Sequence, residues 1–206
     1  EQQAFNVLTS TQATKAFDIR QEDAATRERY GRNRWGQQLL LARRLVESGV
    51  DLVTAQFSGA LCGGVGNWDD HAVNANCFEA IKYRLQFMDK AVAALIEDIY
   101  DRGLDQDVMV VVTGEFGRTP KINKDAGRDH WGPLNTSFFA GGGVRGGNVI
   151  GASDKIAGYP IADKQTPENL AASIYHALGI DHDAVWKDNN DRPYRIYHAA
   201  PIAGLV

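Results

Sequence analysis

The sequence has few cysteines, no long apolar run and no excess of positive charge, and each absence excludes a class of protein. Cys62 and Cys77 are too few for a disulfide framework and lack C-x-x-C metal-site spacing, so we favour burial over one disulfide. No apolar run approaches the roughly 18 residues that a membrane span needs. Lys and Arg number 22 against 26 Asp and Glu, and the net charge of −4 argues against nucleic-acid binding through the phosphate backbone.

What the sequence does contain is typical of a folded chain. Hydrophobic residues make up 44% and charged residues 23% of the 206 positions, which excludes disordered and fibrous classes. This length allows one large domain or two small ones. Many of the 21 glycines lie in three segments that follow predicted strands, at 59–66, 114–132 and 141–151, where special backbone geometry is expected.

The order of the apolar patterns predicts an α/β protein. Residues 1 to about 48 are typical of helix, and the β-branched segment 50–57 that follows predicts a strand. A long helix is expected over about 74–102, and the five apolar residues 108–112 are typical of a central parallel strand covered on both faces. Further elements are expected as strands at 136–140 and 148–150, a helix at 166–178 and an edge strand at 192–197.

Polar residues follow two of the predicted strands, where ligands bind in α/β sheets. Asp69 and His71 follow the strand at 50–57, Glu115 follows the strand at 108–112, and His130 stands fifteen residues beyond Glu115. Carboxylates combined with neutral imidazoles suit zinc, manganese or iron rather than calcium. The pattern therefore predicts a divalent metal site, with zinc or manganese as candidates.

Each part of this constellation also has a simpler structural interpretation. The Asp69–His71 segment could cap the helix at 74–102, Glu115 could pair with Arg118, and His130 could be a structural histidine. Their joint placement after two strands favours a site. Arg118 and Arg128 flank it and could grip an anionic group, or could pair with Glu115 and Asp129.

A glycine-rich segment at 141–147 resembles a phosphate-binding loop only in composition. It lacks the Lys-Ser/Thr pair of a P-loop and precedes no helix-start signal. It is predicted to be a turn at the exit of a strand.

These residues resemble a known family. The motifs Trp68-Asp69-Asp70-His71, Gly114-Glu115-Phe116-Gly117-Arg118-Thr119-Pro120, Gly127-Arg128-Asp129-His130-Trp131 and 140–147 are similar to a bacterial family, the domain of unknown function 1501. The run from 85 to 117 resembles the alkaline phosphatase/sulfatase superfamily, in which a helix leads into a central strand with acidic ligands at its exit. The resemblance covers nearly the whole chain and implies an α/β three-layer sandwich with a mostly parallel sheet, present as its C-terminal portion.

The resemblance also implies roles for individual residues. Superfamily members usually bind two metals, so Asp69, His71 and His130 would form the first site and Glu115 would contribute to a second or shared site. Arg118 and Arg128 would steer the anion. The superfamily nucleophile follows the first strand, and residues 1–50 contain no such pattern. Residues 1–206 are therefore expected to be one domain without its N-terminal half, inactive alone and with no assigned catalytic residue.

The implied activity is that of a metal-dependent hydrolase of phosphate or sulfate esters. Its partner would be an anionic small molecule or a glycan ester, and family members look exported to the periplasm or beyond. The competing hypothesis is a non-catalytic binding or envelope protein that keeps the fold. Phe116 favours this alternative, because it stands where the superfamily has a metal-binding histidine.

Overall fold

The computed structural model describes residues 11–61, 64–65, 67–72 and 76–205. The chain divides into two compact units. One comprises residues 1–104 and 121–129 and is called the helical unit below. The other comprises residues 105–120 and 130–206 and is called the strand unit.

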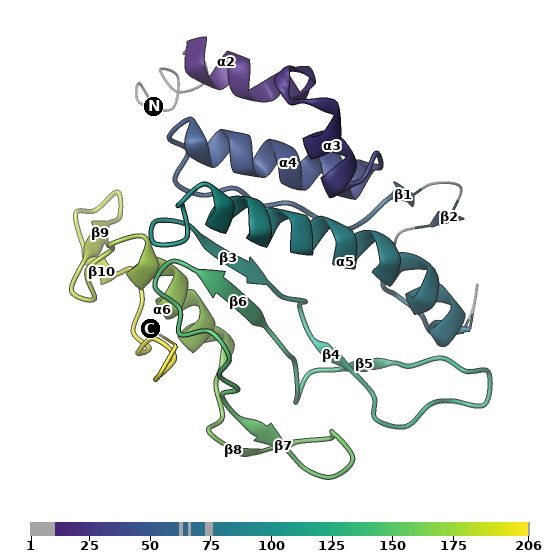
Figure 1. The fold of residues 1–206 in the computed structure, drawn as a ribbon. Coiled ribbons are helices and arrows are strands. Elements are labelled where there is room, and N and C mark those ends of the chain that lie inside the picture. Colours follow the sequence, from purple (N-terminus) through teal and green to yellow (C-terminus); the bar gives the residue numbers. More distant parts are fainter. Residues whose placement is uncertain (1–10, 62–63, 66, 73–75, 206) are drawn as a thin grey trace. The chain divides into compact units, whose positions relative to one another are not determined.

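The helical unit is built on two long helices. α4 (Arg34–Glu47) packs against α5 (Cys77–Asp101), and the shorter helices lie along α4 (Figure 1). Tyr30, Trp35 and Leu40 are fully buried in its core. The remaining elements are α2 (Thr11–Phe17), η1 (Ile19–Gln21), α3 (Ala24–Tyr30) and the hairpin of β1 (Ala60–Leu61) with β2 (Gly64–Val65).

Short polar side chains and glycines set the ends of these helices. The Asn33 side chain accepts hydrogen bonds from the backbone N–H groups of Trp35 and Gly36 at the start of α4, as an N-cap does. Gly49, with φ +93°, follows the end of that helix, as expected for a glycine there. Gly36 allows α4 to approach the preceding turn, since a Cβ there would lie 2.0 Å from the Tyr30 carbonyl oxygen.

A buried charge network joins α4 to α5. Arg43 is 3% exposed, and its guanidinium pairs with Asp98 at 2.9 Å and with Glu22 at 3.0 Å. Asp98 also accepts hydrogen bonds from Tyr30 and Arg102, both at 2.8 Å. Burial alone would raise the pKa of Asp98, but these hydrogen bonds and the charge of Arg43 outweigh it and hold the pKa below its ordinary value.

The strand unit contains one helix and eight short strands among its described residues. β3 (Met109–Val112) pairs antiparallel with β6 (Phe138–Gly141), with Met109 opposite Gly141. α6 (Pro167–Ala177) begins with a capping box formed by Thr166 and Asn169. The other strands pair as β4 (Gly117–Arg118) with β5 (His130–Trp131), β7 (Ala152–Ser153) with β8 (Pro160–Ala162), and β9 (Val185–Lys187) with β10 (Pro193–Arg195).

The predicted fold class is wrong. Over the described residues, the strands form five two-stranded sheets, all antiparallel, with no parallel sheet and no three-layer sandwich. A parallel pair needs a crossover connection, usually a helix. The chain between β3 and β6 instead forms the β4–β5 hairpin, so β6 returns antiparallel to β3.

The predicted strand at 50–57 is also wrong, because this segment has no ladder partner in the described part of the chain. Two indole N–H groups bind carbonyls at its end instead: Trp68 donates to Phe57 at 2.7 Å and Trp35 donates to Ser58 at 3.2 Å. The expected strand at 148–150 is irregular, and β7 begins just after it.

Several other predictions are confirmed. The helices expected at 74–102 and 166–178 are α5 and α6. The strands expected at 108–112 and 192–197 contain β3 and β10, and the strand expected at 136–140 overlaps β6. Three successive positive φ values end β6 at Gly141–Gly143, which confirms the strand-exit turn. Cys77 is buried and free, whereas Cys62 lies outside the described residues.

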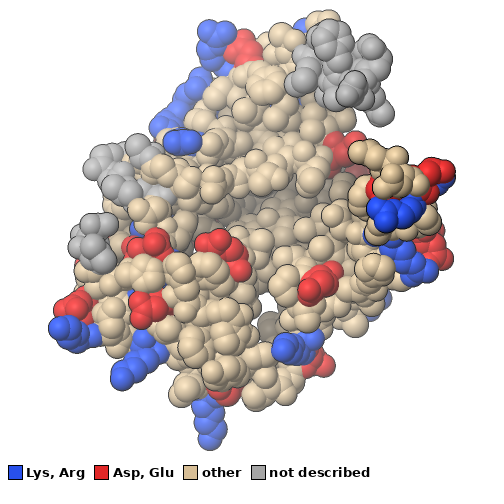
Figure 2. Space-filling model, turned by 180° about the vertical axis from the view of Figure 1, so that it is seen from behind, with Lys and Arg blue, Asp and Glu red and all other residues tan. Residues whose placement is uncertain are grey.

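Charges of both signs are mixed on the surface. On the face drawn in Figure 2, the described Lys and Arg side chains lie among Asp and Glu and form no broad basic area. Exposed ion pairs include Arg29 with Glu97 and Asp101, both at 3.0 Å. Among the described residues, no helix is long and apolar enough to cross a membrane.

Candidate metal centre

The loop 67–72 of the helical unit carries Asp69 and His71 and is anchored to α5. The Asp70 carboxylate pairs with the 3% exposed Arg84, whose guanidinium also donates to the Asn67 carbonyl. The Trp68 ring lies under the same guanidinium, 5.1 Å from ring centroid to Cζ. Asp70 therefore holds the loop against α5, whereas the Asp69 side chain is 60% exposed.

This loop does not cap α5. The N-cap of that helix is Asn76, whose side chain accepts a hydrogen bond from the backbone N–H of Phe78 at 2.8 Å. The simpler interpretation of the Asp69–His71 segment as a helix cap is therefore wrong.

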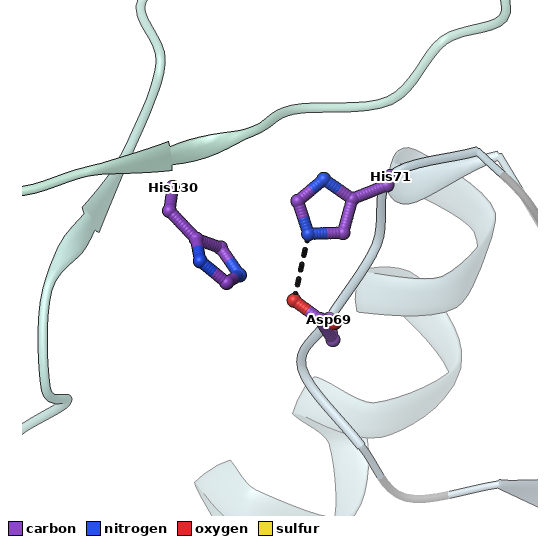
Figure 3. Close-up of side chains that lie close together, drawn as sticks. All are labelled: Asp69, His71 and His130. Atoms are coloured by element: carbon purple, nitrogen blue, oxygen red, sulfur yellow. Dashed lines mark hydrogen bonds and ion pairs between the residues drawn. The ribbon is translucent and has the colours of Figure 1, made fainter.

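His71 lies between two carboxylates. Its Nε2 is 2.8 Å from Oδ1 of Asp69, the contact drawn in Figure 3, and its Nδ1 is 2.8 Å from Oδ1 of Asp129. The His71 side chain is 28% exposed, and both aspartates are more than half exposed. The three side chains, called the His71 cluster below, therefore lie open to solvent on the helical unit.

The segment 121–129 brings Asp129 to His71 by close backbone packing. The Arg128 N–H donates to the Asp70 carbonyl at 3.0 Å, and the Asn123 side chain accepts a hydrogen bond from the Gly127 N–H at 2.8 Å. Gly127 is required for this approach, since a Cβ there would lie 2.4 Å from the carbonyl carbon of His71. The Ala126 carbonyl accepts from the N–H of Cys77 at 2.9 Å and ties the segment to α5.

The donor set of the His71 cluster fits a divalent metal ion. A neutral imidazole has one N–H and one lone pair, so only one of the two ring nitrogens can donate to a carboxylate. When Nδ1 is protonated and donates to Asp129, the Nε2 lone pair faces Asp69. Nε2 and the Asp69 carboxylate can then bind the same cation. A carboxylate that orients the far nitrogen of a ligating histidine is a recurrent arrangement in metal sites.

His130 is the third side chain that could ligate an ion. The sequence predicts His130 as a further ligand, and Figure 3 draws it with Asp69 and His71, the pair that belongs to the helical unit. His130 directly follows Asp129 in the chain, so the peptide bond keeps its Cα about 3.8 Å from that of Asp129. It is also the first residue of β5 in the strand unit.

Within the strand unit, Phe116 supports the His130 ring. The two ring centroids are 4.2 Å apart with an interplanar angle of 37°. The Arg118 guanidinium carbon lies 5.9 Å from the Phe116 centroid, and Arg118 is opposite His130 in the β4–β5 register. Phe116 is therefore a packing partner for His130.

Glu115 is not one of the potential metal ligands in the structure. It is exposed, and in the described part of the chain it makes no hydrogen bond or ion pair with Arg118 or any other residue. The potential ligand group does not include it. Its role at a second metal, and the anion-binding roles of Arg118 and Arg128, stay predictions.

Asp129 is the residue of the candidate site that the sequence does not select, because the sequence suggests only Arg128 as its partner. Its position beside His130 was visible in the sequence, but its contact with His71 spans 58 residues. A carboxylate next to a candidate ligand histidine was the available signal.

The family model described as "Protein of unknown function (DUF1501)" matches residues 1–206. The chain belongs to DUF1501. The predicted family resemblance is thereby confirmed, whereas the placement of DUF1501 in the alkaline phosphatase/sulfatase superfamily stays a prediction. Neither the curated proteins nor the solved structures contain a match to this DUF1501 chain.

Proposed function

We propose that this DUF1501 protein binds one divalent metal ion, zinc or manganese, and uses it in the hydrolysis of phosphate or sulfate esters. The observation that carries the proposal is the placement of His71 between Asp69 and Asp129, at 2.8 Å from each. A neutral His71 ring can donate to only one of the two carboxylates, so its other nitrogen has a lone pair to offer to a cation.

Each residue of the proposed site has a distinct role. Asp69 Oδ1 and His71 Nε2 would hold the ion from the helical unit, and His130 would supply the third ligand. Asp129 fixes the tautomer and orientation of His71, and Phe116 supports the His130 ring. A bound metal ion supplies a Lewis acid that polarises an ester oxygen and lowers the pKa of bound water.

The substrate side of the proposal rests on charge and on motif resemblance. Arg118 and Arg128 are the cations that would receive an anionic ester, in a small molecule or a glycan. Glu115, predicted to contribute to a second or shared metal, is not part of this one-ion site. The resemblance of these motifs to the alkaline phosphatase/sulfatase superfamily supports ester chemistry and an exported location.

A second candidate function is a non-catalytic binding protein. Its support is Phe116, which packs on His130 where the superfamily has a metal-ligating imidazole. This alternative predicts that no ester is turned over in the full-length protein even when metal binds.

Zinc titration by calorimetry of protein stripped with a chelator tests the metal site. We expect one ion per chain, with affinity lowered about 100-fold or more in His71→Ala and His130→Ala. His176→Ala, at an exposed position on α6, is the matched control and should bind as the wild type does. Wild-type protein that takes up no zinc or manganese would refute the proposal.

Full-length protein carrying stoichiometric metal then separates the two functions. Hydrolysis of an aryl phosphate or aryl sulfate that His71→Ala abolishes supports the hydrolase. Metal uptake without turnover of either ester supports the binding protein.

A further inference from the structure

The β9–β10 hairpin of the strand unit exposes two stacked aromatic rings. Trp186 and Tyr194 are directly opposite each other in the antiparallel register, so their side chains share one face of the hairpin. The ring centroids are 5.3 Å apart with an interplanar angle of 25°. Trp186 is 54% exposed and Tyr194 is 43% exposed, and the pair is called the aromatic platform below.

The turn of this hairpin is held by one aspartate. Asp188 Oδ1 accepts hydrogen bonds from the backbone N–H groups of Asn190 and Arg192 at 2.8 and 3.0 Å. The Arg192 guanidinium also donates to the Asp188 carboxylate at 2.8 Å. The turn therefore fixes the register that stacks the two rings.

The base of the hairpin is anchored to α6. Tyr197 is buried, stacks on Tyr175 with centroids 5.3 Å apart, and donates its hydroxyl to the Ile180 carbonyl at 2.9 Å. The Ile196 N–H donates to the Ala184 carbonyl at 3.1 Å. A platform built on such a base is preorganised, which lowers the entropic cost of binding.

The charges around the platform neutralise one another. Lys187 pairs with Asp191 at 2.9 Å, Arg192 with Asp188 at 2.7 Å and Arg195 with Asp183 at 2.8 Å. Every cation of the hairpin is thus matched by a carboxylate. A ligand that depends on phosphate neutralisation, such as single-stranded nucleic acid, finds no net positive field here.

The size and chemistry of the platform select a ligand with an apolar face and a polar edge. Two rings offer far less than the roughly 800 Å² per partner that a stable protein interface buries. The faces of aromatic rings are negative and attract C–H groups of partial positive charge. The surrounding carboxylates and guanidinium groups offer hydrogen-bond partners to hydroxyls.

We propose that the aromatic platform binds a sugar ring of an oligosaccharide or polysaccharide, with the apolar face of the pyranose stacked on the outward face of Trp186, whose other face packs on Tyr194. The hairpin holds none of the proposed metal ligands. Sugar binding therefore stands or falls separately from the metal site.

Native affinity electrophoresis tests the proposal in gels that contain xylan, a mixed-linkage β-glucan, a galactan or carrageenan. We expect at least one polysaccharide to retard the protein, and Trp186→Ala or Tyr194→Ala to weaken that binding about tenfold. Because the cations are already paired, retardation by a neutral polysaccharide should be the same at about 50 and about 200 mM salt.

Tyr159→Ala is the matched control. Tyr159 is 53% exposed and pairs with Trp131, but its edge-to-face packing offers no stacked platform, so retardation should be unchanged. Circular dichroism verifies the fold of each variant, and Tyr194→Ala decides the outcome if Trp186→Ala unfolds.

Three results would overturn the proposal. They are no retardation in any of the four gels, retardation that neither platform variant reduces, and a platform that binds oligothymidylate or a second copy of the chain instead. Sedimentation velocity of the wild type and Trp186→Ala detects the last case.

Discussion

The Asp129 carboxylate lies 2.8 Å from Nδ1 of His71, although 58 residues separate the two in the chain. This contact joins the loop before α5 to the segment 121–129 within the helical unit. It gives an exposed histidine a fixed orientation, since a second carboxylate, Asp69, lies at its other nitrogen.

Asp129→Asn is expected to weaken zinc binding about 10–100-fold without unfolding the protein. The amide keeps the shape of the side chain but offers a weaker acceptor to the His71 N–H, so the orientation of the ring is less well held. Calorimetric titration with zinc measures the change. Asp125→Asn, an exposed position in the same segment, serves as control, and an equal loss in that variant would contradict a role for Asp129.

Gly127→Ala is expected to lower the free energy of unfolding by about 1–3 kcal/mol and to weaken zinc binding as well. The new Cβ would lie 2.4 Å from the backbone carbon of His71 and 2.6 Å from the N atom of Ala72, so the segment 121–129 must move. Urea denaturation and zinc titration measure the two effects. Gly132→Ala, where a Cβ meets nothing within 4 Å, should leave both nearly unchanged.

Asp98→Asn is expected to destabilise the helical unit by about 3 kcal/mol, because it leaves the buried Arg43 short of a counter-charge. Asp101→Asn, whose partner Arg29 and own side chain are both exposed, should cost less than about 1 kcal/mol. Urea denaturation at neutral pH compares the two variants. Equal losses would show that the Asp98 network does not hold α4 against α5.

The same network predicts an acid-labile contribution to stability. The pKa values of Asp98 and Glu22 lie below their ordinary values in the folded protein, where arginine hydrogen bonds outweigh the effect of burial. Their contribution is therefore complete above the ordinary carboxyl pKa of about 4 and is lost as the pH falls through the folded values. Asp98→Asn should show a smaller loss of unfolding free energy between about pH 5 and pH 3, and a pH profile parallel to that of the wild type would contradict this.

Zinc at about 100 times its dissociation constant should raise the unfolding free energy by about 2.7 kcal/mol. Removal by a chelator should reverse the effect, because the ion binds the folded chain in preference to the unfolded one. Thermal unfolding with and without zinc measures it. His71→Ala should show a shift of less than about 0.5 kcal/mol, and a shift of wild-type size in that variant would place the zinc elsewhere.

The helices could be predicted because their signals are local. The apolar spacing of α5 and the Thr166 cap of α6 lie within one stretch of chain each, and the structure confirms both helices. The direction of the sheet could not be predicted in this way. The apolar run of β3 indicates a strand but does not indicate which strand pairs with it or in which direction. The β4–β5 connection determines that β6 returns antiparallel to β3.

The candidate site shows the same division. Asp69 and His71 are two residues apart, and their spacing after an apolar segment was enough to select them. The roles of Asp70 and Phe116 were not readable, because they depend on Arg84 in α5 and on His130 across the β4–β5 pair. Side-chain partners that are distant in the chain leave no periodic trace in the sequence.

The sequence by itself determined membership of DUF1501, the main helices with their caps, and the residue types able to hold a metal ion. Tertiary structure alone decided that the strands pair antiparallel, that Asp129 orients His71, and that Trp186 and Tyr194 stack in the open. The physical reason is the distance along the chain over which each interaction acts. Helix propensity and capping act over a few residues, whereas strand direction and the partners of a carboxylate depend on the path of the chain between distant segments.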